Sequence, residues 1–194
     1  MHSQKEEIEL LKKQISNAIP GALSRLYFLI NSKLIAYLIQ LSCGDKHKIA
    51  KDIIQELFLW IAKNHKKLEN IKNLETYLYS AAKNNYLKEL KKINLVSLEY
   101  NVDGHKFFKN NTNIENSHEK KIIQLDCKNE KDLWLNKALQ SLPEVQQEVL
   151  YLRYYTGLDY NQISEILKVS KQICRNYVFR ALRSLRKAKN YCPK

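Results

Sequence analysis

Residues Leu142–Leu185, LPEVQQEVLYLRYYTGLDYNQISEILKVSKQICRNYVFRALRSL, decide the fold of this chain. Their apolar residues recur at helical spacing and predict a short amphipathic helix, a break of three to four residues and a second helix. The exposed face of the second helix is basic. This layout is typical of a helix-turn-helix, whose second helix enters the major groove of DNA.

Local signals place the ends of these helices. Ser141 and Glu144 predict a capping box, with Pro143 in the first turn of the helix. Asp159 and Gln162 predict a second capping box at the start of the helix that buries Ile163, Ile166 and Leu167. Ser170 is the expected N-cap of the last helix.

The last helix is the candidate DNA reader. Its predicted inward stripe is Ile173, Tyr177, Ala181 and Leu185, with Cys174 and Val178 beside it. A recognition helix reads bases mainly from its first turns, and later basic residues hold phosphates. Lys171, Gln172, Arg175 and Asn176 are therefore the candidate base readers, and Arg180, Arg183, Arg186 and Lys187 would hold phosphates. The alternative is a solvated basic helix. The main site expected to contact DNA comprises Lys171, Gln172, Arg175, Asn176, Phe179, Arg180 and Arg183.

Composition bounds the fold class. The chain has 194 residues, 44% of them hydrophobic, with 4 Gly and 3 Pro. It can therefore bury real cores, and it has few residues that make tight turns. We predict an all-α protein of two helical domains joined by a flexible linker. The expected boundaries are 1–93 for the N-terminal domain, 94–131 for the linker and 132–194 for the C-terminal domain. Val96–Val102 could form a short extended piece within the linker.

The charge favours a polyanionic partner. Lys and Arg outnumber Asp and Glu by 16 to 9 in residues 1–93 and by 11 to 4 in residues 136–194, whereas residues 94–135 hold 6 against 7. Nucleic acid is the leading partner, with an anionic membrane surface as the alternative. No apolar run reaches the length of a membrane span and no signal peptide opens the chain, so we expect a cytoplasmic protein without membrane insertion.

The cysteines and histidines predict no metal site. Cys43, Cys127, Cys174 and Cys192 form no C-x-x-C pair, and no histidine has zinc-finger spacing to them. Free thiols and surface histidines are expected. We predict neither a metal nor a cofactor.

Four helices are expected in the N-terminal domain, and Asp52–Trp60 in the third carries the first unusual pattern. Asp52, Gln55 and Glu56 share one helix face, opposite a stripe expected to be buried that includes Ile53, Leu57 and Trp60. This acidic face could be simply solvated, could hold a catalytic metal through its carboxylates, or could dock a basic protein partner. No further ligand cluster supports the metal.

The segment Thr76–Lys92 carries the second pattern, in which lysines, asparagines and tyrosines alternate. Lysines hold a nucleic-acid backbone, and aromatic faces can stack on unpaired bases. We expect Tyr77 to lie in the core, and we expect Lys83, Asn84, Lys88, Lys91 and Lys92 to contact nucleic acid.

Taken together, the motifs resemble those of the sigma-70 family of RNA polymerase sigma factors, in its two-domain extracytoplasmic-function group. DIIQELFLW at Asp52–Trp60 resembles the core-polymerase-binding motif D-x-x-Q-E-x-F-x-x-W, one residue tighter before the Trp. YLYSAAKN at Tyr77–Asn84 resembles the promoter-melting helix, with Tyr77 in place of the usual Trp. The segment from Leu142 to Tyr154 and the helix-turn-helix follow in the family's order.

The resemblance implies a role for each site. Asp52, Gln55, Glu56 and Phe58 would dock on core RNA polymerase. The −10 region and its unpaired strand would be engaged by Asn70, Lys72, Asn73, Lys83, Asn84, Lys88, Lys91 and Lys92. The last helix would read the −35 region, where Ser170–Cys174 departs from the usual S-x-x-T-V.

The sequence therefore predicts a non-enzymatic sigma factor of bacterial type that binds core RNA polymerase and promoter DNA, with an anti-sigma factor as a further partner. The alternatives are a helix-turn-helix regulator that works without polymerase and, third, a nucleic-acid-processing enzyme that uses Asp52 and Glu56.

Overall fold

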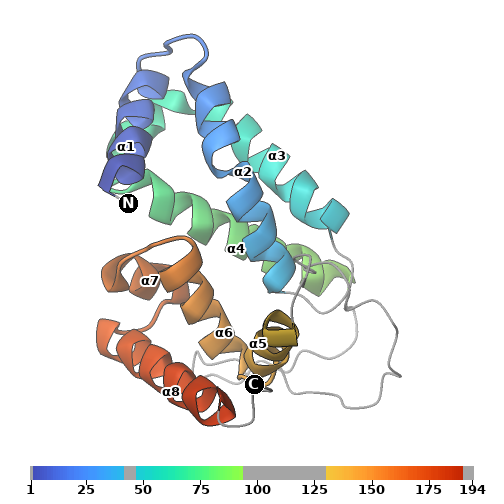
Figure 1. Ribbon diagram of the computed structural model, residues 1–194. Coiled ribbons are helices and arrows are strands. Elements are labelled where there is room, and N and C mark those ends of the chain that lie inside the picture. The colour runs from blue at the N-terminus through green and yellow to red at the C-terminus, as the bar shows by residue number, and fades with distance from the viewer. Residues whose placement is uncertain (1, 42–46, 94–129, 190–194) are drawn as a thin grey trace.

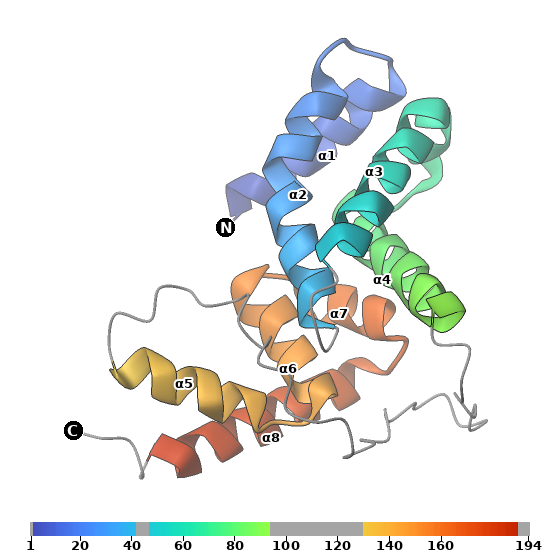
Figure 2. The same ribbon diagram turned by 90° about the vertical axis from the view of Figure 1, so that its right-hand side faces the viewer.

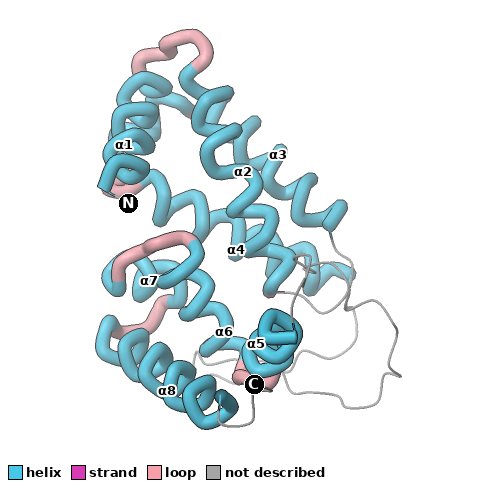
Figure 3. The backbone as a smooth tube through the Cα atoms, viewed as in Figure 1, coloured by secondary structure: helices cyan, strands magenta, loops and turns pink. Residues whose placement is uncertain are grey.

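The computed structural model describes residues 2–41, 47–93 and 130–189, and every regular element in these ranges is a helix (Figures 1 and 3). The predicted all-α fold is confirmed. The expected linker, with its possible extended piece at Val96–Val102, lies outside the described residues apart from its last two positions, which begin a helix.

The N-terminal block, as we call α1–α4, buries one face of each helix. Its elements are α1 (His2–Ser16), α2 (Ala22–Gln40), α3 (His47–Lys63), the 3-10 turn η1 (His65–Asn70) and α4 (Leu74–Ile93). Ile8, Leu11 and Ile15 of α1 are buried, whereas Ile19 lies beyond the end of α1 and is exposed. Between α1 and α2, Gly21 takes a φ of 79°, a backbone conformation that glycine adopts at little cost.

Helix α2 is apolar around most of its circumference. By length and composition it could cross a membrane, which the prediction from apolar runs missed. Its residues Leu26, Ile30, Leu34 and Leu38 are fully buried against neighbouring helices. Packing within the bundle is thus a sufficient reason for its apolar sequence.

The C-terminal block, as we call α5–α8, contains the helix-turn-helix. Its elements are α5 (Glu130–Gln140), α6 (Glu144–Leu150), the π-helical turn η2 (Tyr151–Tyr155), α7 (Tyr160–Leu167) and α8 (Lys171–Lys189). The core stripe of α8 is Cys174, Val178 and Ala181, whereas Ile173 and Tyr177 are only half-buried. The predicted stripe is therefore rotated by about one residue.

One of the two predicted capping boxes forms. Asp159 accepts from the backbone N–H groups of Asn161 and Gln162, and the Gln162 side chain accepts from the N–H of Asp159. The box at Ser141 and Glu144 was wrong, because the Ser141 hydroxyl donates to the carbonyl of Ala138 at 2.7 Å. Pro143 is the N-cap of α6 and has no side-chain oxygen to offer.

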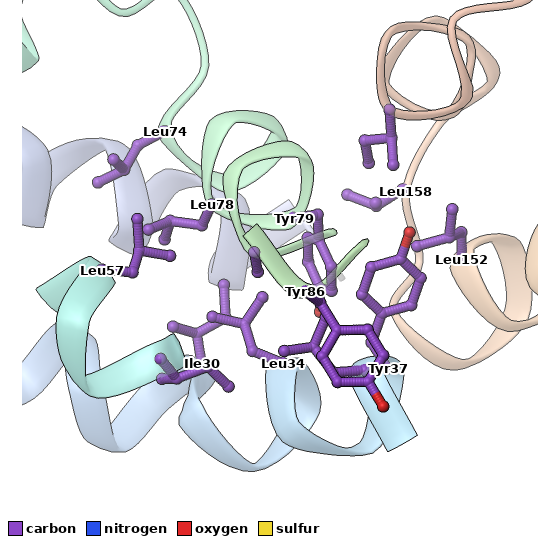
Figure 4. Packing of buried hydrophobic residues seen from close by; sticks show 14 of the residues in the cluster. Ile30, Leu34, Tyr37, Leu57, Leu74, Leu78, Tyr79, Tyr86, Leu152 and Leu158 are labelled. Atoms are coloured by element: carbon purple, nitrogen blue, oxygen red, sulfur yellow. The ribbon is translucent and has the colours of Figure 1, made fainter. Parts of the chain in front are cut away.

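The two blocks share one apolar core. Figure 4 shows Leu152 and Leu158 of the C-terminal block facing Tyr37 of α2 and Tyr79 of α4, and all four side chains are buried. Helix α7 lies between α4 and α8, with α8 on the far side from the N-terminal block (Figures 1 and 2). The blocks therefore pack through α2 and α4 on one side and through α6, η2 and α7 on the other.

Candidate functional site

The helix-turn-helix presents every predicted DNA-contacting side chain to solvent. Lys168 closes α7 in the left-handed conformation (φ 56°, ψ 40°), and the Ser170 hydroxyl accepts from the N–H of Ile173 at the start of α8. The seven expected contacts are all exposed: Lys171, Gln172, Arg175, Asn176, Phe179, Arg180 and Arg183. The outer face of α8 is therefore open to solvent, as the predicted reading of DNA by this helix requires.

Three of the four candidate base readers have contacts with neighbouring side chains. The Gln172 amide donates to the Asn176 side chain at 3.3 Å, so these two amides form a pair on the exposed face. The Arg175 guanidinium lies 5.7 Å from the centroid of the Tyr160 ring, and that of Arg153 lies 4.8 Å from it. Such cation–π contacts hold an arginine weakly and leave its donors available.

The acidic face of α3 adjoins an apolar groove. Asp52, Gln55 and Glu56 are exposed as predicted. Phe58 is buried at 7% exposure, which corrects its placement on the exposed docking face, and its ring packs edge-on against Tyr27 at 5.0 Å between centroids. A groove of ≈ 490 Å³ between α2 and α3 is lined by Leu23, Ser24, Tyr27, Phe28, Gln55, Phe58, Leu59 and Ala62.

Sequence reasoning missed the most exposed residues of this groove. Phe28 is 80% exposed and Leu59 is 59% exposed, although both are large and apolar. The available signal was the run Leu26–Ile30, which is apolar on every side of α2 and therefore exceeds what one buried face needs. Apolar side chains beside carboxylates form a surface suited to an amphipathic basic partner.

Trp60 corrects a second prediction on α3. It was expected in the buried stripe, but it is 37% exposed and its ring lies against that of Tyr77 at 5.8 Å. Tyr77 itself is half-buried, and desolvation raises the pKa of its hydroxyl. These two rings form an aromatic surface between α3 and α4.

The predicted −10 residues spread along η1 and α4. Asn70, Lys72, Asn84, Lys88, Lys91 and Lys92 are exposed. The Asn73 side chain accepts from the N–H of Thr76 at 2.8 Å and thus caps α4, while Lys92 pairs with Glu89. Asn84, Leu87, Lys88 and Lys91 line a second pocket together with Lys168 of the helix-turn-helix. The expected −10 surface of α4 therefore meets the turn of the helix-turn-helix at this pocket.

Lys83 differs from the other lysines of α4 because its side chain is only 17% exposed. Its ammonium group donates to the Glu148 carboxylate of α6 at 2.7 Å. The Tyr37 hydroxyl donates to the same oxygen at 2.5 Å. Burial, and then the Glu148 charge, raise the pKa of Tyr37, so this hydroxyl stays protonated as the donor.

Among the described residues, no three His, Cys, Asp or Glu side chains gather into a potential metal site. Among these residues, Asp52 and Glu56 therefore do not belong to a cluster of three or more potential metal ligands.

Comparison with known proteins found one family match and a similar solved structure. Residues 132–185 match the family model "Sigma-70, region 4". The fold is similar to that of the sigma factor RpoE in its co-crystal structure with the anti-sigma factor NepR from Bartonella quintana, with a TM-score of 0.56 and 19% identity over 88% of this chain and 98% of that chain. No curated protein matches. The family match therefore covers the C-terminal part of the chain, and the structural match shows that the whole fold is shared with a sigma factor.

Proposed function

We propose that this protein is a sigma factor that binds core RNA polymerase through α3 and directs it to promoters by recognising −10 and −35 elements. It acts in the cytoplasm by binding and carries no active site of its own. Residues 1–93 serve polymerase and −10 binding, 132–194 serve −35 binding, and 94–131 connect them. The observation that carries the proposal is the apolar groove of α2 and α3 beside the acidic face of α3, on a chain whose residues 132–185 match the sigma-70 region 4 model.

The groove supplies what a plain operator-binding regulator does not need. Asp52 and Glu56 would attract a basic helix of the polymerase, and Phe28 and Leu59 would bury their apolar surface against it. Phe58 supports this surface from below and does not form its outer contact. A regulator that works alone would leave these large apolar side chains in water.

The DNA contacts divide between the two blocks. The first turns of α8 would read −35 bases, and α4 with η1 would hold the −10 region and its unpaired strand. The fold shared with RpoE, which binds NepR, leads us to infer an anti-sigma factor for this chain as well.

The decisive experiment is transcription in vitro with core polymerase and genomic fragments, with and without this chain. We expect discrete start sites that appear only in its presence. Operator binding with no effect on start sites would instead favour a helix-turn-helix regulator, and metal-dependent turnover of nucleic acid would favour an enzyme.

Docking is tested by Glu56→Lys, which places a cation on the acidic face. We expect loss of co-purification with core polymerase and an unchanged melting temperature, because Glu56 is exposed. Glu69→Lys is the matched control, since it reverses the charge of an exposed glutamate on η1, away from the groove. Normal association of the Glu56 variant would remove the docking assignment.

The reader helix is tested by Arg175→Ala. We expect upstream-element binding to weaken by about 1–3 kcal/mol and preference at one base position to relax. The control is Arg186→Ala, three turns further along α8, which removes the same charge from an exposed arginine. Equal effects of both variants would mean that Arg175 contributes only charge.

A further inference from the structure

The surface of α4 that bears Lys83 is covered by the protein's own C-terminal block. Glu148 is buried in the contact, and two further hydrogen bonds flank it. The Gln40 amide donates to the carbonyl of Gln147 at 3.2 Å, and the Tyr151 hydroxyl donates to the carbonyl of Lys33 at 3.2 Å. The rings of Tyr37 and Tyr151 also stack at 6.0 Å. The C-terminal half of α2 and the middle of α4 therefore contact the C-terminal block, which lies against them in Figure 2.

The Glu148 carboxylate takes the place at Lys83 that a phosphate of nucleic acid could occupy. A carboxylate oxygen of Glu148 accepts from a lysine and from a tyrosine hydroxyl, the two donor types that also hold the phosphates of nucleic acid. Without Glu148, Lys83 would be a cation beside the exposed Asn84 and Lys88. A nucleic-acid strand could then bring its own negative charge to the same donors.

The chain cannot bind the −10 and −35 elements of one promoter at the same time in this closed arrangement. Lys168 lines one pocket of ≈ 370 Å³ with Asn84 and Lys88 of α4. The reader helix begins at Lys171, three residues further on, a chain length of at most about 11 Å. Promoter elements somewhat more than two helical turns apart are separated by roughly 80 Å of duplex. The blocks must therefore separate before both faces can hold their elements.

We propose that Glu148 holds the free chain closed by occupying Lys83 and Tyr37, so that nucleic acid can engage Lys83 only after the blocks separate. Desolvation offsets most of the attraction in a buried ion pair, but removing one partner leaves the other charge buried and unpaired, which strongly disfavours the closed arrangement. On opening, Glu148 returns to water while a phosphate replaces it at Lys83, so the exchange leaves no buried charge unpaired. The role of Lys83 rests on the proposed function, whereas closure by Glu148 does not.

The test uses the full chain with Glu148→Gln, which removes the charge and keeps the size of the side chain. Closure is measured by small-angle scattering, where one compact body of this length has a radius of gyration of about 16 Å. Binding is measured with a fluorescein-labelled single-stranded oligonucleotide. We expect a larger radius and binding tighter by roughly tenfold, the factor that corresponds to 1.4 kcal/mol.

Two variants distinguish loss of the Glu148 contact from the general effect of removing one negative charge. Glu144→Gln removes an exposed carboxylate from the same helix and should leave both the radius and the affinity close to wild type. Tyr37→Phe removes only the hydroxyl and should shift both in the direction of Glu148→Gln, which keeps the test valid if the Glu148 variant fails to fold.

An unchanged radius for both Glu148→Gln and Tyr37→Phe would overturn closure. A larger radius without tighter binding would overturn the blocking of Lys83, as would equal gains in affinity for Glu144→Gln and Glu148→Gln. If opening and tighter binding occur but the chain supports no transcription with core polymerase, the proposed function fails while closure by Glu148 stands.

Discussion

Asp159 caps the first helix of the helix-turn-helix, and replacing it with alanine should destabilise the protein by about 1–2 kcal/mol. The variant loses the acceptor for two backbone N–H groups, at 2.9 Å from Asn161 and 3.0 Å from Gln162, and removing such a cap typically costs about 1 kcal/mol. It also loses an exposed pair with Lys5 at 3.4 Å, where such pairs contribute about 0–1 kcal/mol.

Two matched variants divide this loss between the cap and the charge. Asp159→Asn keeps a capping oxygen and removes the charge, so we expect a cost of less than about 1 kcal/mol. Lys5→Met removes only the ion pair and should cost no more than Asp159→Asn. Thermal unfolding of the full chain measures all three, at roughly 2–4 °C per kcal/mol for a protein of this size. If the Asn and Ala variants lose equal stability, the capping argument is refuted.

The pH dependence of this series has a defined sign. Burial alone would raise the pKa of Asp159, but hydrogen bonds from the backbone of Gln162 and Asn161 and from Lys5 lower it below its ordinary 3.8. A carboxylate with a lowered pKa stabilises the fold above its unfolded-state value and loses this contribution as pH falls through the folded-state pKa. The difference between wild type and Asp159→Asn should therefore be full at neutral pH and shrink in acid below pH 3.8.

Three further variants test other parts of the fold. Lys168→Gly should stabilise the protein by about 0.5 kcal/mol in urea unfolding. Glycine relieves about 1–2 kcal/mol of left-handed backbone strain, but its greater freedom in the unfolded chain costs about 0.4–1 kcal/mol. Burial raises the pKa of Glu75, so this group opposes folding as pH rises above 4.5, and Glu75→Gln should raise the melting temperature at pH 7 but not at pH 4. Phe28→Asp should abolish polymerase co-purification without lowering the melting temperature, since this ring is 80% exposed.

The helices could be predicted because their signal is local. Stripes such as Leu26, Ile30, Leu34 and Leu38 specify which face of a helix is buried, whatever packs on it. The error at Ser141 also has a local cause. Once Pro143 is the N-cap, Glu144 is the first helical residue and cannot be the third, so the S-x-x-E spacing has no matching position in the helix.

The error on α3 follows from the tight spacing of its motif. In F-x-x-W the tryptophan would fall at position 61, and here Ile61 occupies that position and is fully buried. Trp60 is displaced by one residue, about 100° around the helix, to the edge of the core. The departure from the motif was visible in the sequence, and with it Ile61 instead of a tryptophan fills the buried position.

The pairing of Lys83 could not be predicted, because Glu148 is 65 residues further along the chain. No periodicity relates positions in different blocks. The same holds for the groove, whose two walls come from α2 and α3 and whose apolar side chains look like core residues when each helix is considered alone. Local patterns thus identify the candidate residues, and the packing of the blocks decides which of them are accessible.

The positions of the acids in residues 136–194 allow this part of the chain both to contact the N-terminal block and to bind DNA. Residues 136–194 hold 11 Lys and Arg and only 4 acids, Glu144, Glu148, Asp159 and Glu165. Two of these, Glu148 and Asp159, bond to lysines of the N-terminal block. They lie before α8, so the reader helix has no acid on its outer face to repel phosphate. Separation of the blocks would release Lys83 and Lys5 together and raise the positive charge available to DNA on the N-terminal block, where the −10 strand is expected to bind.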